Sequence, residues 1–168
     1  MKFASKLLAA ITAGSLLTLA PAMAADPYPS KPIRMVVAFP AGGSADINAR
    51  AVGQQLGKEL GGNVIVDNKG GAGGNVGAVE AKRAAPDGHT IFYATSAVVL
   101  SPSLYANPGF DPYTDFTPIS LTATIPLVLV VNAGLPPKTF GEFVNWAKGQ
   151  GGKLNYASSG AGALLHLA

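Results

Sequence analysis

The chain of 168 residues has no cysteine and few charged side chains. Without cysteine it has no disulfide, cysteine zinc site, iron–sulfur cluster, catalytic thiol or lipid-modified N-terminal cysteine. Charged residues make up 12% of the sequence, against roughly 25% in an average globular domain. Hydrophobic residues make up 48%, and a composition this apolar and this poor in charge argues against a disordered chain.

Positive charge is scarce outside the N-terminus. The net charge is +3, from 12 Lys and Arg against 9 Asp and Glu, and it falls to +1 without Lys2 and Lys6 (10 against 9). Nucleic-acid-binding surfaces are strongly basic. We therefore predict that the protein has no nucleic-acid partner.

Apolar runs long enough to cross a membrane are also lacking. The run at residues 7–20 follows Lys2 and Lys6, has 14 residues, and falls short of the roughly 20 that span a bilayer. Ala22-Met23-Ala24 then forms a small-x-small pattern, which is typical of a signal-peptide cleavage site. We predict a signal peptide over residues 1–24, cleaved after Ala24, and export to a bacterial periplasm; a membrane anchor is the alternative. Export disfavours ATP- or NAD-dependent chemistry, and we predict no cofactor.

Strand-like and helix-like segments alternate along the remaining chain. The nearly continuous apolar run at 33–39 is typical of a strand that is buried on both faces. Ser44 is a good N-cap for the helical pattern that follows, and Phe140, Phe143, Val144 and Ala147 form a stripe expected in the core. The alternation predicts an α/β fold with a mostly parallel, doubly wound sheet. Strands are expected at 33–39, 63–67, 90–94, 119–123, 127–132 and 154–156, and helices at 44–60, 75–85, 97–104, 139–148 and from 162 onward.

Four turns of small residues follow predicted strands, at 40–44, 68–74, 95–96 and 157–162. In doubly wound sheets, ligands bind beyond the carboxyl ends of the strands. In the first turn, Gly42 and Gly43 permit close approach to the backbone, and the helix that Ser44 opens favours an anion at its N-terminus. A plain strand-to-helix turn is the alternative. Asp46 either interacts with the helix dipole or accepts a hydrogen bond from a ligand.

The second and fourth turns superficially resemble known motifs but lack parts of them. Gly71, Gly73 and Gly77 approximate a dinucleotide-binding pattern, but the next strand ends in Thr95-Ser96 instead of an acidic residue. The turn is therefore predicted to contact a ligand through its backbone, or to be only a tight turn. Ser158 and Ser159 lack the G-x-S-x-G pattern of a nucleophilic serine.

The two histidines give no clear sign of catalysis. His89 follows Asp87-Gly88 in a predicted surface turn, and we interpret it as structural. His166 lies in the last helical segment, where a role in a pocket stays open. The histidines and carboxylates show no metal-ligand spacing. We predict no catalytic residue and no metal site, with an exported α/β hydrolase-like enzyme as the alternative.

Several motifs together resemble one family. They are YPSKPI at 28–33, FPAGGSAD at 39–46, NKGGAGG at 68–74, APDGHT at 85–90 and NYASSG at 155–160. The sequence resembles the Bug-type periplasmic solute-binding receptors of tripartite tricarboxylate transporters. The resemblance implies a type II periplasmic-binding-protein fold, in which two doubly wound α/β domains enclose a cleft. Domain 1 is then expected at 25–123, without its C-terminal return, and the crossover and start of domain 2 at 124–168.

The resemblance also implies a function and a set of contacts. A receptor of this kind captures a small carboxylate and delivers it to two integral membrane subunits, one large and one small. We expect it to act as a monomer. We also expect the sequence to be an N-terminal fragment of such a receptor or the product of a truncated gene, and a non-functional remnant is a further alternative. Carried over by position, the ligand-binding residues are Gly42, Gly43, Ser44 and Asp46 in the first turn, Gly73 and Gly74 in the second, Thr95 and Ser96 in the third, and Ser158, Ser159, Gly160 and Ala161 in the fourth.

Overall fold

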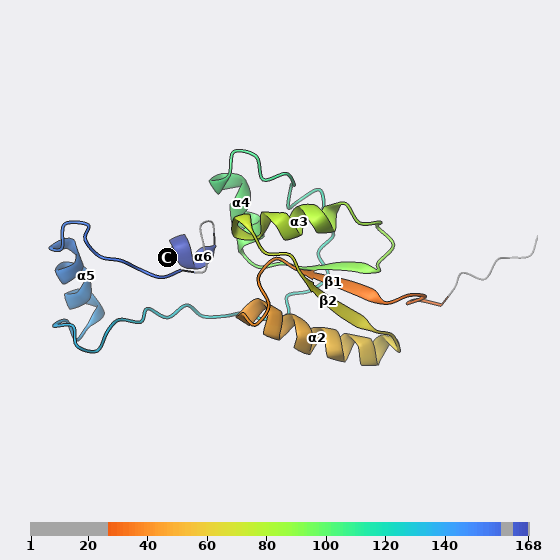
Figure 1. Ribbon diagram of the computed structural model, residues 1–168, viewed down its shortest axis with the longest axis horizontal. Helices are drawn as coiled ribbons and strands as arrows, with labels where there is room; N and C mark the ends of the chain where they lie inside the picture. The colour runs from red at the N-terminus through yellow and green to blue at the C-terminus, as the bar shows by residue number, and fades with distance from the viewer. Residues whose placement is uncertain (1–26, 159–162, 168) are drawn as a thin grey trace, which may run out of the picture.

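A three-stranded parallel sheet lies at the centre of the protein (Figure 1). The computed structural model describes residues 27–158 and 163–167, so the predicted signal peptide lies outside the described residues. The elements in chain order are β1 (Ile33–Val37), α2 (Ser44–Leu60), β2 (Val64–Asn68), the 3-10 turn η1 (Ala72–Gly74), α3 (Asn75–Lys82), β3 (Thr90–Tyr93), α4 (Ala97–Leu104), α5 (Phe140–Lys148) and α6 (Leu164–Leu167).

The strand order is β2-β1-β3, and both pairings are parallel. Ile33 pairs with Val64 of β2, and Arg34 pairs with Thr90 of β3. Helix α2 packs against β1 and β2 on one face of the sheet, and α3 packs against β1 and β3 on the other (Figure 1). The prediction of an α/β fold with a parallel sheet is confirmed.

β1 is buried on both faces because it lies between two strands and two helices. Met35 and Val37 pack with Ala49 of α2 in one apolar cluster. On the α3 side, Ala78 packs with Val98 of α4 and Phe110 in a second cluster. Full burial of such side chains stabilises a fold by roughly 1.5–3 kcal/mol each for the larger ones. This explains why the strand is apolar except at Arg34, which pairs with Asp67 and Glu80.

A segment before β1 is tied to the turn that precedes β3. The Tyr28 hydroxyl donates to the Gly88 carbonyl at 2.8 Å, and the Lys31 ammonium lies 2.8 Å from the Asp87 carboxylate. The Ser30 N–H donates to Nε2 of His89 at 3.2 Å. The structure therefore supports the interpretation of His89 as a structural residue.

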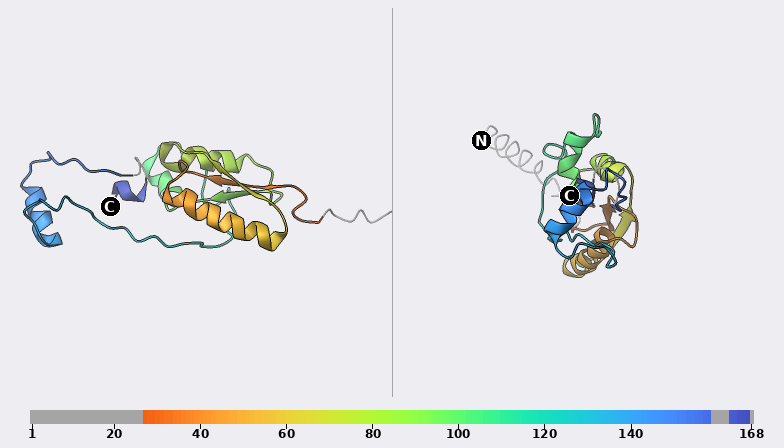
Figure 2. Two further views of the ribbon diagram at one scale, coloured as in Figure 1. Left: turned by 60° about the horizontal axis from the view of Figure 1, so that its bottom comes forward. Right: turned by 90° about the vertical axis from the view of Figure 1, so that its left-hand side faces the viewer.

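The prediction of strands at 119–123, 127–132 and 154–156 is wrong, since these residues form no strand in the structure. They belong to a stretch over residues 117–158, which we call the outer arm. Its first part still contacts β3, where the hydroxyls of Tyr93 and Thr122 are 2.9 Å apart, and its later part, with α5, extends away from the sheet (Figures 1 and 2). Its apolar side chains are exposed, with Ile119 at 80% and Val130 at 82%. A strand is stable only when its backbone groups pair with a neighbour, and within the described residues the arm has none.

Helix α5 in the outer arm begins where the sequence predicts, but its apolar stripe is not buried. No residue of α5 is buried, and Phe140 is 70% exposed. The assignment of Phe140, Phe143, Val144 and Ala147 to the core is therefore wrong for the part of the chain that the structure describes. The spacing identified an apolar face correctly, but this face has no surface to pack against here.

The remaining differences concern element ends. Helix α3 stops at Lys82 instead of residue 85, shortly before Pro86, whose ring disfavours helix in the residue before it. The last helix covers only Leu164–Leu167, while residues 162 and 168 lie outside the described part. Among the described residues, no helix combines the length and the apolar character needed to span a bilayer.

Candidate functional site

The first and second predicted turns lie against each other at the carboxyl edge of the sheet. Because β1 lies between β2 and β3, the loops after all three strands emerge side by side. A side chain added at Gly70 would place its Cβ 3.1 Å from Cδ of Pro40, and one at Gly74 would lie 3.3 Å from Cβ of Ala38. The structure therefore brings the 40–44 turn and the 68–74 turn together. Helices α5 and α6 lie beyond this same edge (Figures 1 and 2).

The first turn leaves the start of α2 without a side-chain cap. Gly42 has a φ of 85°, a left-handed conformation that favours glycine. Gly43 occupies the N-cap position, and no side chain there accepts a hydrogen bond from the helix. The prediction of Ser44 as N-cap is wrong by one residue, because Ser44 is already the first helical residue. The first N–H groups of a helix have no intrahelical acceptor, so this exposed turn can donate to an anion.

The second turn leads into α3, but the backbone N–H groups at this helix start already have acceptors. Those of Gly74 and Val76 donate to the Gly71 carbonyl, and that of Asn75 donates to the Ala72 carbonyl. Gly74 is the N-cap with a φ of 105°, and it also provides no side-chain cap. It is buried against the end of β1, whereas Gly73 is half-buried. The backbone of this turn thus reaches the sheet edge beside the first turn.

A side chain of the third turn partly caps the helix that follows it. The Thr95 hydroxyl accepts from the N–H of Ala97 at 3.3 Å, so this hydroxyl stabilises the start of α4. Ser96 is the N-cap residue of α4 and is exposed. Both residues follow β3 and so lie at the same sheet edge as the first two turns.

Among the predicted site residues that the structure describes, only Asp46 carries a charge that is buried. The residue is 3% exposed. Its Oδ2 accepts from the Gly42 N–H at 2.8 Å and from Nε of Arg50 at 3.0 Å. Its Oδ1 accepts from Nδ2 of Asn68 and lies close to Nη2 of Arg50, both at 3.0 Å. The Arg50 guanidinium, followed by the Gly42 N–H, lowers the pKa of the Asp46 carboxyl to about 2.

Arg50 and Asn68 also belong to this group, although neither was predicted as a site residue. Arg50 lies four residues after Asp46, a spacing that places two charged side chains on one helix face. That signal was available in the sequence. Asn68 ends β2, and its side chain reaches Asp46 only because β1 and β2 pair in a particular register.

The fourth predicted turn is described only in part. Ser158 is exposed, and Ser159, Gly160 and Ala161 lie outside the described residues. Near it, the Tyr156 hydroxyl and Nδ1 of His166 are 3.0 Å apart. This contact gives His166 a partner in the chain.

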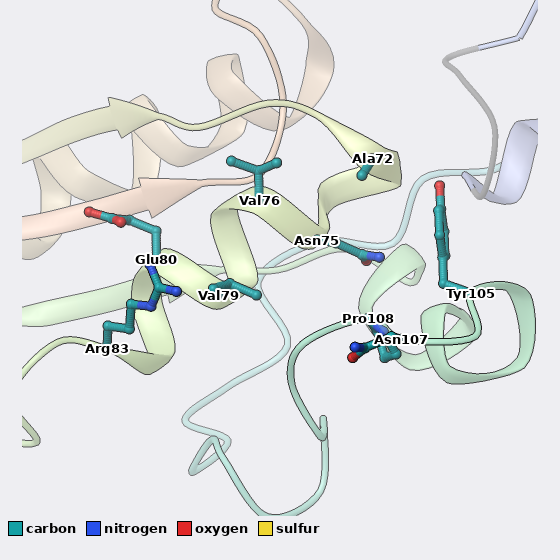
Figure 3. A pocket seen from close by; sticks show the side chains of 9 residues that line it. All are labelled: Ala72, Asn75, Val76, Val79, Glu80, Arg83, Tyr105, Asn107 and Pro108. Carbon is teal, nitrogen blue, oxygen red and sulfur yellow. The ribbon is translucent and has the colours of Figure 1, made fainter.

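A separate open pocket of about 400 Å³ runs along the flank of α3, with Asn75, Val79, Arg83 and Tyr105 among its lining residues (Figure 3). It contains none of the predicted site residues. Within the described residues, no group of three or more His, Asp or Glu side chains could hold a metal ion.

Comparison with known proteins identifies similar chains. The sequence model of the tripartite tricarboxylate transporter family receptor matches residues 48–168. Protein BugT of Bordetella pertussis is 36% identical over 152 residues, which make up 89% of this chain and 46% of that protein. The chain spans about half the length of the curated relatives it matches.

Solved structures of similar proteins share the fold. The periplasmic binding protein BugD is 39% identical, with a TM-score of 0.70 over 83% of this chain and 47% of BugD. Rpa4515 of R. palustris, solved with adipate, is 31% identical, with a TM-score of 0.75 over 81% of this chain and 46% of that one. MatC from Rhodopseudomonas palustris, solved with bound malate, is 34% identical, with a TM-score of 0.70 over 82% and 47%.

Proposed function

Because the chain belongs to the tripartite tricarboxylate transporter receptor family, we propose that it is part of a non-enzymatic receptor that captures a small carboxylate. Similar proteins have been solved with adipate and with malate, which supports a dicarboxylate as the ligand. The binding protein BugD is periplasmic, and the predicted signal peptide with cleavage after Ala24 agrees with export to that compartment.

The observation that carries the proposal is the uncapped N-terminus of α2 at the exposed 40–44 turn, which lies beside the 68–74 turn. Helix α2 begins without a side-chain cap, and its loop touches the second turn through Pro40 and Gly70. The N–H groups at the start of α3 are instead bonded to carbonyls of the second turn itself. Unpaired N–H groups and the helix dipole favour a negative charge at the start of α2. A carboxylate needs no lysine or arginine to bind there.

The proposed ligand contacts come from four turns and two domains. The first three turns belong to domain 1, proposed over residues 25–123, and the fourth belongs to domain 2, which starts after residue 123. The receptor binds as a monomer, without a cofactor, and passes its ligand to one large and one small membrane subunit. The residues proposed for these turns are Gly42, Gly43, Ser44 and Asp46; Gly73 and Gly74; Thr95 and Ser96; and Ser158, Ser159, Gly160 and Ala161. Among them, Asp46 has a supporting place, because its oxygens are bonded within the chain.

A binding measurement tests this function directly. The full-length receptor is titrated calorimetrically with malate and with adipate, and then compared with Gly43→Val. A Cβ at Gly43 would lie 3.6 Å from its nearest neighbour, the Pro40 carbonyl oxygen, so the fold accepts a side chain there. The side chain would occupy the ligand position, and we expect affinity to fall at least about tenfold, or about 1.4 kcal/mol.

Gly141→Val is the matched control, since a Cβ at Gly141 meets nothing within 4 Å and the residue lies in α5, away from the turns. It should bind as the wild type does. Equal affinity of Gly43→Val and wild type would remove the first turn from the site. Failure of the wild type to bind either dicarboxylate would contradict the proposed ligand class, and turnover of an ester would contradict a non-enzymatic role.

A further inference from the structure

The Asp46 carboxylate is buried directly beneath the first turn, and its acceptor positions are occupied by groups of the chain itself. Four donors lie within 3.0 Å of its two oxygens: the Gly42 N–H, the Asn68 amide and two nitrogens of Arg50. A carboxylate offers about four lone-pair positions. A ligand hydroxyl or ammonium group would have to displace one of these donors to contact Asp46.

The group around Asp46 joins three parts of the chain that are separate in sequence. Asn68, at the end of β2, donates from Nδ2 to the Phe39 carbonyl at 3.0 Å as well as to Asp46. Its Oδ1 accepts from Nη2 of Arg50 at 3.3 Å. The first turn of α2 and the start of the second loop are therefore connected through the Asp46 carboxylate, and Asn68 links both to the Phe39 carbonyl just after β1.

The charge of Asp46 is also unsuited to direct contact with an anion. Two like charges in close proximity repel each other, whereas Arg50, with 54% of its side chain exposed, compensates the carboxylate from the solvent side. The hydrogen bond to Asp46 also occupies the Gly42 N–H. The donors left for a ligand are those at the start of α2, which has no side-chain cap.

We propose that Asp46 is a positioning residue of the carboxylate site, which holds the 40–44 and 68–74 turns together so that both face one ligand. It acts through the Gly42 backbone and the Asn68 side chain and does not touch the ligand. The proposal rests on the carboxylate-binding function proposed above. It explains how a site built from flexible glycine turns reaches a defined geometry before the ligand arrives.

Asp46→Asn in the full-length receptor tests the role, because the amide keeps the shape of the side chain but loses one acceptor oxygen. Affinity for malate and adipate is measured by calorimetry, and exchange of the Gly42 amide is measured without ligand. We expect both affinities to fall about tenfold, the factor that corresponds to one buried hydrogen-bond group left unsatisfied. We also expect the Gly42 amide to exchange faster.

Asn68→Ala provides a second variant that retains the Asp46 charge. It should weaken the binding of both dicarboxylates as well. The double variant Asp46→Asn/Asn68→Ala should lose little more affinity than the weaker-binding single variant, because both substitutions act on the same connection. Additive losses would show that the two side chains act separately and would overturn the proposal.

Asp87→Asn is the matched control. Asp87 also pairs with one lysine or arginine side chain and one backbone N–H, from Lys31 and His89, but it precedes β3 at the opposite edge of the sheet. It should leave dicarboxylate affinity unchanged. A loss of affinity equal to that of Asp46→Asn would mean that general destabilisation is responsible, and the positioning role would be rejected.

The sign of the effect separates positioning from direct contact. Adipate has no hydroxyl group that could donate to Asp46. If Asp46 lay beside the ligand, its neutralisation would therefore remove a repulsion, and Asp46→Asn would bind adipate equally well or more tightly. If the wild type binds and the variant gives that result, the positioning role is overturned but the proposed function stands. Failure of the wild type to bind either dicarboxylate would instead reject the proposed function and the positioning role with it.

Discussion

The helices that pack on the sheet and helix α5 of the outer arm are stabilised in different ways. We call residues 27–116, which contain β1 to α4, the sheet unit. In the sheet unit, α2 and α3 bury polar and small residues such as Asp46, Ala49 and Ala78 against the strands. Helix α5 buries none of its residues. Tertiary contacts therefore hold α2 and α3, whereas α5 depends on interactions within its own segment.

The N-termini of these helices show the same contrast. In α5, the Thr139 hydroxyl accepts from the Glu142 N–H, and the Glu142 carboxylate accepts from the Lys138 N–H at 2.7 Å. Helices α2 and α3 begin at glycines with no side-chain cap. An uncapped start costs about 1 kcal/mol relative to a good cap, and helices that pack well can tolerate this cost. The contrast indicates that the open N-terminus of α2 serves the sheet edge and not the stability of the helix, whereas the N–H groups at the start of α3 are bonded to the Gly71 and Ala72 carbonyls.

Gly77→Ala should have the largest effect of the substitutions that test this contrast. A Cβ at Gly77 of α3 would lie 2.9 Å from Cα of Ala38 and 3.0 Å from the Lys69 carbonyl oxygen. Both are backbone atoms that cannot move without shifting β1 and the second turn. We expect the free energy of unfolding of the sheet unit to fall by about 1–3 kcal/mol, as for other overpacked sites, when measured by urea denaturation.

Gly141→Ala in α5 is its counterpart. A Cβ at Gly141 meets no atom within 4 Å, so only the intrinsic helix preference changes, by about 1 kcal/mol in favour of the helix. Amide exchange over residues 140–148 should slow, and the unfolding of the sheet unit should not change. Equal destabilisation by both substitutions would show that α5 is packed as tightly as α3.

Thr139→Ala should have an effect on α5 of similar size to that of Gly141→Ala but of opposite sign, because it removes the cap of the helix. The helix should lose about 1 kcal/mol of local stability, visible as faster amide exchange over residues 140–148. Ser44→Ala is the matched substitution at the start of α2, where the hydroxyl caps nothing. It should leave the stability of α2 unchanged. A loss of stability in Ser44→Ala similar to that in Thr139→Ala would mean that α2 is capped after all.

The same contrast explains which parts of the fold could be predicted from the sequence. The β1–α2, β2–α3 and β3–α4 units were predicted because each combines an apolar run, a turn of small residues and a helical spacing within about 30 residues. The outer arm contains equally apolar segments around Leu121 and Val130. Apolar character alone does not make a strand, because pairing depends on a neighbour that the segment itself does not specify.

The site could be predicted in part for a similar reason. The rule that loops meet at the carboxyl edge of a parallel sheet was enough to group the turns around Gly43, Gly74 and Thr95. The rule does not identify the hydrogen-bond partners of Asp46. The contact with Asn68 depends on the β1–β2 register, in which Val37 pairs with Asn68, and a single sequence does not reveal a register between strands about 30 residues apart.

Asp87→Asn should have the smallest effect on stability and should depend on pH. The Lys31 ammonium, followed by the His89 N–H, lowers the pKa of the Asp87 carboxyl to about 2 from an ordinary value of 3.8. A carboxyl whose pKa is lower in the folded state stabilises the fold above pH 4, and this contribution is lost as the pH falls from 4 towards 2. The Asp87 side chain is 40% exposed, and solvent screening keeps such a pair weak.

The melting temperature of Asp87→Asn should therefore lie slightly below that of the wild type at pH 6, and the difference should narrow between pH 4 and pH 2. A constant difference down to pH 2 would mean that the ion pair does not help to hold the N-terminal segment on the sheet unit.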